Sequence, residues 1–131
     1  MRITKKQIEA ILALPGPKRY SHFIKLAADQ NMVWGLYSEG WALAGTDDQS
    51  NQNEVFPIWP AREYAALCAT GIWEGYCPRE ISLDDLLNGL IPRLKDTGRL
   101  LGVFYTPNDK GVLPSFDQFV ADILSERARI E

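Results

Sequence analysis

Few residues in this sequence could form a zinc site of cysteine and histidine or a disulfide. Its 131 residues include only one histidine and two cysteines. Cys68 and Cys77 lie nine positions apart, unlike the two cysteines of a C-x-x-C redox or zinc motif. We therefore expect no metal and no cofactor, and we expect both thiols to be reduced and packed as small hydrophobic side chains.

Glycine-rich phosphate loops and long apolar runs are also missing. Neither G-x-G-x-x-G nor G-x-x-x-x-G-K-[S/T] occurs, and these are the motifs whose backbone amides cradle phosphates. No stretch approaches the roughly 20 consecutive apolar residues of a membrane helix. Gln7 and Glu9 interrupt the first apolar stretch, which is therefore untypical of a secretory signal. The sequence predicts a cytoplasmic protein with neither a membrane span nor a nucleotide site.

Positive charge is scattered along the chain. There are 14 Lys and Arg against 17 Asp and Glu, which gives a formal net charge of −3. A nucleic-acid interface needs clustered Lys and Arg to neutralise phosphates. The nearest approach to a cluster is spread over two expected helices: Lys5, Lys6, Lys18, Arg19 and Lys25. We interpret these side chains as solvated helix surface and expect no nucleic-acid partner.

The remaining composition is that of an ordinary globular protein. Hydrophobic residues make up 46% of the chain and charged residues 24%, and the length falls within the range of one domain. We therefore expect a single domain over residues 1–131. Within it, residues 1–19 should form an N-terminal helix and a Pro-Gly-Pro break at the periphery.

Hydrophobic periodicity predicts helices where apolar residues recur every three or four positions, and strands where they alternate. The expected helices cover residues 4–14, 18–30, 60–70, 82–94 and 115–124, and the expected strands cover 32–37, 41–44, 54–59 and 100–105. This order, ααβββααβα, predicts an α+β fold in which a small mixed or largely antiparallel sheet of about four strands packs with helices. We expect 100–105 to be a central strand.

Three of the expected helices begin at recognisable cap residues. Thr4 with Gln7 forms a capping-box pattern, and Ser82 with Asp85 forms an acidic version of it. Ser115 precedes the last helix and can accept a hydrogen bond from its first free amides. The starts of these helices are therefore the best-defined boundaries in the sequence.

Turn residues and prolines predict the irregular segments. Ser38-Glu39-Gly40 should connect the first two strands as a β-hairpin with glycine in the turn. Pro57 cannot donate to a ladder, so it indicates an edge strand, a bulge or a strand end. Residues 45–53 form a polar, acidic stretch that should be the most mobile internal loop, and 73–79 should be an ordered aromatic loop. Pro92 should bend or shorten its helix.

Residues suited to catalysis are few and have ordinary structural explanations. His22 is the only imidazole and would be essential to any Ser-His-Asp or Cys-His mechanism, but its position predicts a partly exposed helix residue beside Phe23. Asp84 and Asp85 fit the first turn of a helix, where negative charge is stabilised. Asp47-Asp48 lies in the polar loop and is typical of solvated turns.

Aromatic residues are the unusual component, and most fall within less than half of the chain: Trp34, Tyr37, Trp41, Phe56, Trp59, Trp73 and Tyr76. Because successive side chains of a strand point to opposite faces, Trp34 and Tyr37 should lie on opposite faces. The rings either form the core, with indole N–H groups bonded to carbonyls, or those outside it line a groove with Trp59 and Tyr76. Gly35 fits a β-bulge or close packing against a bulky side chain.

Several ordered blocks of aromatic, glycine and proline residues resemble one known family. The blocks are Val-Trp-Gly-Leu-Tyr at 33–37, Gly-Trp-Ala at 40–42, Phe-Pro-Ile-Trp-Pro at 56–60, Tyr-Cys-Pro at 76–78, Val-Phe at 103–104 and Lys-Gly-Val at 110–112. Taken together they resemble a bacterial family catalogued as domain of unknown function 2750, from about Tyr20 to Leu124. The resemblance implies a compact bacterial domain and brings no activity or catalytic residues with it.

The sequence favours a non-enzymatic protein-interaction module, for example an immunity-like or antitoxin-like domain that masks a basic toxin. The candidate contact residues are Trp34, Tyr37, Trp41, Trp59, Trp73, Glu74, Tyr76 and Arg79. The alternative is a small-ligand-binding protein or an enzyme whose pocket lies near 73–79, where Glu74, Tyr76 and Arg79 would supply the polar groups. The sequence identifies neither the partner nor the oligomeric state.

Overall fold

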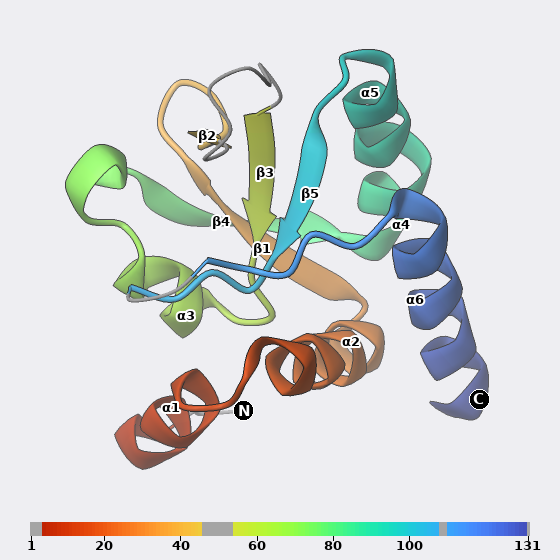
Figure 1. Ribbon diagram of the computed structural model, residues 1–131, viewed down its shortest axis with the longest axis horizontal. Helices are drawn as coiled ribbons and strands as arrows, with labels where there is room; N and C mark the ends of the chain where they lie inside the picture. Colours follow the sequence, from red (N-terminus) through yellow and green to blue (C-terminus); the bar gives the residue numbers. More distant parts are fainter. Residues whose placement is uncertain (1–3, 46–53, 108–109, 131) are drawn as a thin grey trace.

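The computed structural model describes residues 4–45, 54–107 and 110–130, so nearly all of the acidic loop expected at 45–53 lies outside the described residues. The helices are α1 (Lys5–Leu12), α2 (Gly16–Gln30), α3 (Arg62–Leu67), α4 (Leu83–Asp85), α5 (Ile91–Asp96) and α6 (Phe116–Ile130), with a 3-10 turn η1 (Gly71–Trp73) and a π-helical turn η2 (Leu86–Leu90). The strands are β1 (Met32–Tyr37), β2 (Ala44–Gly45), β3 (Glu54–Ile58), β4 (Cys77–Ser82) and β5 (Leu100–Val103). The predicted α+β class is confirmed (Figure 1).

Two small sheets meet through a single bridge. β1 and β4 pair antiparallel, whereas the second sheet has the order β2-β3-β5, with β2 antiparallel and β5 parallel to β3. The backbone N–H and C=O of Trp34 bond with those of Trp59 at 2.8 Å each, which joins β1 to the chain just after β3. The predicted combination of mixed strand pairing with covering helices is therefore confirmed.

The middle strand of the second sheet is β3, so the prediction that 100–105 is central was wrong. Those residues form β5, whose far side carries one bridge, to Val112. Pro57 lies inside β3. Along a strand, the backbone N–H groups of every second residue point to the same side. Because the N–H of Trp59 points to Trp34, the backbone nitrogen of Pro57 faces that same side, away from β5. β2 pairs only with residues 54 and 55, so Pro57 falls in a gap of the ladder and the middle strand tolerates it.

β4 lies partly within the segment that was expected to be an aromatic loop. It pairs with β1 along its full length, but only Ile81 of its side chains is buried, so its hydrophobic alternation is weak. The expected hairpin partner of β1, 41–44, makes a single bridge between Tyr37 and Trp41 and then turns away to form β2. The connecting turn contains Gly40, as expected, and its residue with positive φ is Glu39, at 58°.

All three predicted helix caps are confirmed. The Thr4 hydroxyl accepts the N–H of Gln7 at 3.1 Å, and the Gln7 side chain accepts the N–H of Thr4 at 2.9 Å. The Ser82 hydroxyl accepts the N–H of Asp85 at 3.1 Å, and the Ser115 hydroxyl accepts an N–H three residues later at 3.1 Å. Each cap stabilises its helix by about 1 kcal/mol.

The helical segment 83–96 is continuous because a π-helical turn precedes Pro92. The N–H of Ile91 bonds to the C=O of Leu86, five residues back. Pro92 has no N–H. In an α-helix the C=O of Leu87 would accept the N–H of Ile91, and in a continued π-helix it would accept an N–H from residue 92. It receives neither bond, because the N–H of Ile91 goes to Leu86 and Pro92 has none. The π turn accommodates the proline in the first turn of α5, so Pro92 neither ends nor shortens the helix.

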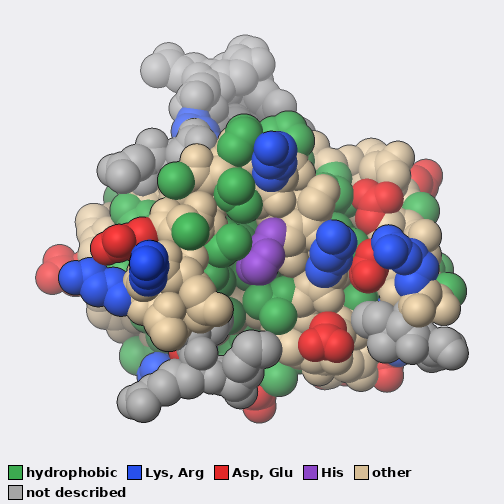
Figure 2. Space-filling view, turned by 90° about the horizontal axis from the view of Figure 1, so that it is seen from below, with side chains coloured by type: hydrophobic (Ala, Val, Ile, Leu, Met, Phe, Trp, Pro, Cys, Tyr) green, Lys and Arg blue, Asp and Glu red, His purple; other side chains and the backbone are tan. Residues whose placement is uncertain are grey.

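Arg19 is buried, which corrects the interpretation of this residue as solvated surface. Its side chain is 2% exposed, and its guanidinium donates to the C=O of Leu14 at 2.7 Å and to the C=O of Lys110 at 3.3 Å. It thereby ties the connection between α1 and α2 to the chain that precedes α6. On the face seen in Figure 2, exposed charges of both signs are mixed around the single histidine.

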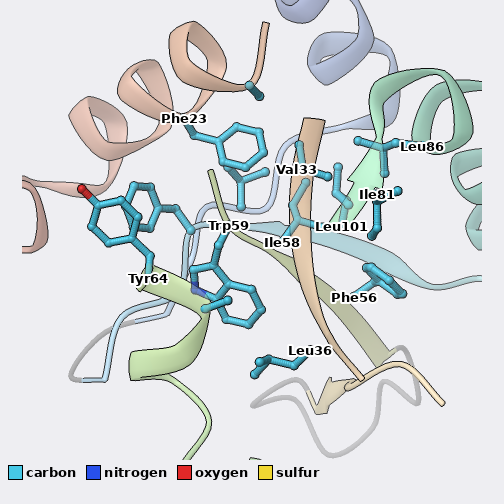
Figure 3. Close-up of a cluster of buried hydrophobic side chains, with 14 of the residues drawn as sticks. Phe23, Val33, Leu36, Phe56, Ile58, Trp59, Tyr64, Ile81, Leu86 and Leu101 are labelled. Atoms are coloured by element: carbon cyan, nitrogen blue, oxygen red, sulfur yellow. The ribbon is translucent and has the colours of Figure 1, made fainter. Parts of the chain in front are cut away.

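One hydrophobic cluster holds the described elements together. Its most deeply buried side chains include Phe23, Val33, Leu36, Ile58, Trp59, Leu83, Leu86, Leu101, Val103, Phe104, Phe119 and Ile123. Figure 3 shows several of them around Trp59, from α2, β1, β3 and β5. α1 has no buried residue and packs against the cluster only through partly buried side chains. Within the described ranges, no helix has the length and apolar composition of a membrane span.

Candidate functional site

A surface groove lies between the β1–β4 pair and the helical segment 83–96. Its cavity volume is about 580 Å³. We call it the Trp41 groove, and its lining residues are Tyr37, Trp41, Arg79, Glu80, Ile81, Asp85, Gly89, Leu90 and Arg93. Most of the charged side chains of the lining are exposed, so the groove opens to solvent along its walls.

A second hollow continues the Trp41 groove toward the end of α5. Its volume is about 260 Å³, and Trp41, Leu90 and Arg93 line both hollows. The other residues of the second hollow are Leu43, Phe56, Leu94, Thr97 and Arg99. The two hollows therefore share one apolar centre and one arginine.

Trp41 is held in place by a glycine and by two aromatic rings. A Cβ at Gly35 would lie 2.9 Å from the Trp41 ring, so the absence of a side chain there lets the indole rest on β1. The predicted close packing of Gly35 against a bulky side chain is confirmed. Tyr37 meets the indole edge to face at a centroid distance of 5.1 Å, and Phe56 meets it at 5.6 Å.

Arg79 covers the rings at the sheet side of the groove. It lies opposite Gly35 in the β1–β4 register, on the face that also carries Tyr37. Its guanidinium carbon is 4.3 Å from the centroid of Tyr37 and 5.8 Å from that of Trp41. Both distances lie within the range of a cation–π interaction.

The charges of the groove are separated along its length. Glu80 and Asp85 lie where β4 turns into α4, whereas Arg93 and Arg99 lie along and just beyond α5. Arg99 forms an ion pair with Glu54 at 3.2 Å. Arg79 and Arg93 form no ion pair with any carboxylate of the described residues, although both line the groove. Two guanidinium groups are thus available to an anionic group in the groove.

The π turn forms part of the helical wall. Gly89 lies in this turn and lines the groove, and a Cβ there would meet no atom within 4 Å. Single π turns are frequent at functional sites. The missing side chain at Gly89 leaves the helix backbone accessible from the groove.

The structure brings together only three of the eight predicted contact residues: Tyr37, Trp41 and Arg79. Trp59 and Trp73 belong to the core, where their indole N–H groups donate to the C=O of Tyr105 at 2.8 Å and of Leu43 at 3.3 Å. The core interpretation therefore holds for these two rings, and the groove expected to include Trp59 and Tyr76 contains neither of them.

The other three predicted contact residues lie outside the groove lining. Trp34 is half-buried and points to the opposite face of β1 from Tyr37. Glu74 is exposed just after η1, and Tyr76 is half-buried just before β4. The pocket predicted at 73–79 is divided, because Arg79 alone of its three polar side chains lines the groove.

Sequence reasoning missed the helical wall of the groove, which Asp85, Gly89, Leu90 and Arg93 supply. Asp85 was interpreted only as the partner of the Ser82 cap and as a first-turn charge, and its backbone N–H does donate to the Ser82 hydroxyl. The one available signal was Pro92, because a proline inside a strongly amphipathic helix requires a local change of helix type.

The two thiols differ from each other. Cys68 is buried, as predicted, and its Sγ lies 3.4 Å from the C=O of Tyr105, which also accepts the Trp59 indole. Burial raises the pKa of the Cys68 thiol from 9.0 to about 11, and the nearby Trp59 N–H offsets part of that rise. Cys77 is exposed, so the prediction that it packs as a small hydrophobic side chain was wrong: it lies on β4, which covers little core.

Titratable groups outside the groove have structural roles. Burial, and then the charge of Lys25, lowers the pKa of His22, which is half-buried in α2 as predicted. The Tyr20 hydroxyl donates to Asp122 at 2.6 Å and ties α2 to α6. Burial and this hydrogen bond raise the pKa of Tyr20. Among the described residues, no three His, Cys, Asp or Glu side chains are grouped so that they could hold a metal ion.

Comparison with known proteins gives one match. Residues 20–123 match the model of a family described as protein of unknown function (DUF2750). No curated protein and no solved structure matches the chain.

Proposed function

Since the chain belongs to the DUF2750 family, whose description states no activity, we propose a function from the site itself: a non-enzymatic protein-interaction module that holds a segment of a partner protein in the Trp41 groove. The observation behind this proposal is the pairing of an accessible aromatic wall with two arginines that form no ion pair with a described carboxylate. A cytoplasmic location is part of the proposal.

The composition of the groove supports a protein partner. Tyr, Trp and Arg are the residue types most enriched among the energetically dominant contacts of protein interfaces. Here Tyr37, Trp41 and Arg79 form one stacked unit, so binding would cost little side-chain entropy. The apolar centre with charged ends also matches the core-and-rim arrangement of interfaces.

The test compares partners retained by wild-type protein with those retained by Trp41→Ala in cells that naturally carry the protein. We expect at least one partner to be lost from Trp41→Ala and kept by Leu124→Ala, which removes an exposed apolar side chain on α6. Circular dichroism of both variants checks that the fold persists. An unchanged set of partners in a folded Trp41→Ala protein would refute the proposal.

Small-ligand binding, or catalysis, in the same groove is the second candidate. The volume of about 580 Å³ lies within the range of ligand pockets, roughly 300–1,000 Å³. A thermal-shift screen with metabolites tests it. A reproducible rise in melting temperature that Arg79→Ala abolishes would favour this function over the first, and a flat screen would count against it.

The immunity-like version of the module is supported less well by this groove. A domain that masks a basic toxin needs exposed carboxylates at its contact surface, because the potentials of the two partners should be complementary. The lining of the Trp41 groove carries two exposed carboxylates, Glu80 and Asp85, and two arginines, Arg79 and Arg93, and none of the four forms an ion pair with a described residue. Because half of these charges are positive, the groove complements a basic toxin only in part.

A further inference from the structure

The separation of charge along the Trp41 groove restricts the segment that can bind there. Asp85 lies where β4 becomes α4, Arg79 and Glu80 precede it on β4, and Arg93 and Arg99 lie along and beyond α5. From Asp85 to Arg93 the helical wall rises by about 12 Å, at 1.5 Å per residue. A bound segment of a few residues therefore meets both the acidic and the basic end.

The centre of the groove supplies an apolar contact beside Arg93. Trp41 and Leu90 line both hollows, so an apolar side chain in either hollow touches both of them. The Trp41 indole N–H forms no hydrogen bond with the described residues and can donate to a backbone carbonyl of the segment. Arg93 lines the same two hollows, so its guanidinium is within reach of the residues that flank the apolar anchor.

We infer that the groove selects an acidic peptide segment: one whose apolar side chain packs on Trp41 and Leu90 while a carboxylate close to it in sequence pairs with Arg93. Arg93 is then the specificity-determining residue, because it lines both hollows and forms no ion pair with a described carboxylate. Arg79 is partly engaged by the Tyr37 ring, and Arg99 by Glu54. This inference rests on the proposed function.

A random peptide library displayed on phage provides the probe. Selection against immobilised wild-type protein should enrich peptides in which an aromatic or aliphatic residue is flanked by Asp or Glu. Synthetic copies of the enriched peptides should bind Arg93→Glu about tenfold more weakly than wild type. Arg93→Gln should lose less affinity, because charge reversal adds repulsion to the lost attraction and a neutral side chain does not. Arg62→Glu makes the same charge change at an exposed position of α3 and should leave affinity unchanged.

The outcomes separate this inference from the proposed function. Enriched peptides that need Trp41 but lack acidic residues, or that bind Arg93→Glu as well as wild type, would overturn the acidic-segment inference and leave the proposed function standing. No enrichment, or peptides that bind Trp41→Ala unchanged, would overturn both. Enrichment of Lys-containing peptides by Arg93→Glu in a parallel selection would support the inference directly.

Discussion

Two aromatic clusters in this protein have similar ring geometry and opposite surroundings. In the core cluster, Trp59 meets Trp73 edge to face at 5.9 Å. In the groove cluster, Tyr37 meets Trp41 edge to face at 5.1 Å. Trp59 is wholly buried, whereas Tyr37 and Trp41 keep part of their surface exposed beside Arg79. The geometry of a ring pair therefore does not distinguish a structural cluster from a binding one.

The polar atoms of the rings make that distinction. Both indole N–H groups of the core cluster donate to backbone carbonyls, because a buried donor without a partner costs about 1–3 kcal/mol. The Trp41 N–H forms no hydrogen bond with the described residues, and it needs none because the ring reaches solvent. A tryptophan with an unused donor and a cation near its face is thus available for a partner, whereas Trp59 is not.

The largest expected effect separates the two clusters by stability. Trp59→Ala should lower the free energy of unfolding by about 3–5 kcal/mol, since it leaves a cavity in the core and removes the indole hydrogen bond to the C=O of Tyr105. Trp41→Ala should lower it by only about 1–2 kcal/mol, because part of the ring already contacts water. Urea unfolding followed by far-ultraviolet circular dichroism measures both. Equal losses would mean that the Trp41 cluster is structural as well.

Sequence reasoning reached the local features of the fold. Thr4, Ser82 and Ser115 cap helices as predicted, because a cap depends on residues three positions apart. β4 was missed because its pairing with β1 depends on contacts distant in sequence, and a strand with one buried side chain carries no clear period. Pro57 was expected at an edge strand, a bulge or a strand end for a similar reason, since the gap in the ladder beside it is a property of the sheet.

The candidate site was predicted only on its sheet side. Tyr37 and Trp41 could be chosen from aromatic content, and Arg79 as a polar group of the segment 73–79. Aromatic content also selected Trp59, which has the same chemistry as Trp41 and proved to be core. Which ring is buried depends on how β3 and β5 pack with the helices. That packing joins residues distant in sequence, so the residues next to each ring do not indicate it. Arg93 was missed because nothing near it in sequence indicates that its helix faces Trp41.

The next prediction uses the two cysteines, one beside each cluster. Because the pKa of the Cys68 thiol rises from 9.0 to about 11 on folding, the folded state holds this proton more tightly than the unfolded chain does. The thiol therefore stabilises the fold fully below pH 9, and this contribution, about 2 kcal/mol, is lost as the pH rises from about 9 to about 11.

Two variants isolate the contribution of Cys68. Tyr64 also has a raised pKa through burial, so the stability of the wild type should fall above pH 10 for more than one reason. We therefore compare the slopes of the free energy of unfolding against pH, measured by urea unfolding. Between pH 9 and 11 this free energy should fall less steeply for Cys68→Ala than for wild type. Cys77→Ala should follow the wild type because Cys77 is exposed. Identical slopes for Cys68→Ala and wild type would contradict the assignment.

A smaller effect tests what holds the groove cluster in place. Gly35→Ala puts a methyl group 2.9 Å from the Trp41 ring, so the indole must shift, and we expect a loss of about 1–2 kcal/mol together with weaker binding in the groove. Gly40→Ala is the matched control, since a Cβ there meets no atom within 4 Å, and its effect should stay within about 0.5 kcal/mol. Thermal unfolding and near-ultraviolet circular dichroism report stability and ring position. If the two variants behave alike, close packing at Gly35 does not position Trp41.

The smallest effect concerns the cation itself. Arg79→Ala should lower the free energy of unfolding by only about 0.5–1 kcal/mol, the usual value for a cation–π contact at an exposed site. Arg62→Ala, at an exposed position without a ring beneath it, serves as the control and should change stability by less. A loss above about 2 kcal/mol would place Arg79 with the structural residues and not with the binding surface. A small loss of stability with a clear loss of binding would instead show that the groove cluster keeps its arginine for a partner, which is the distinction that the two clusters predict.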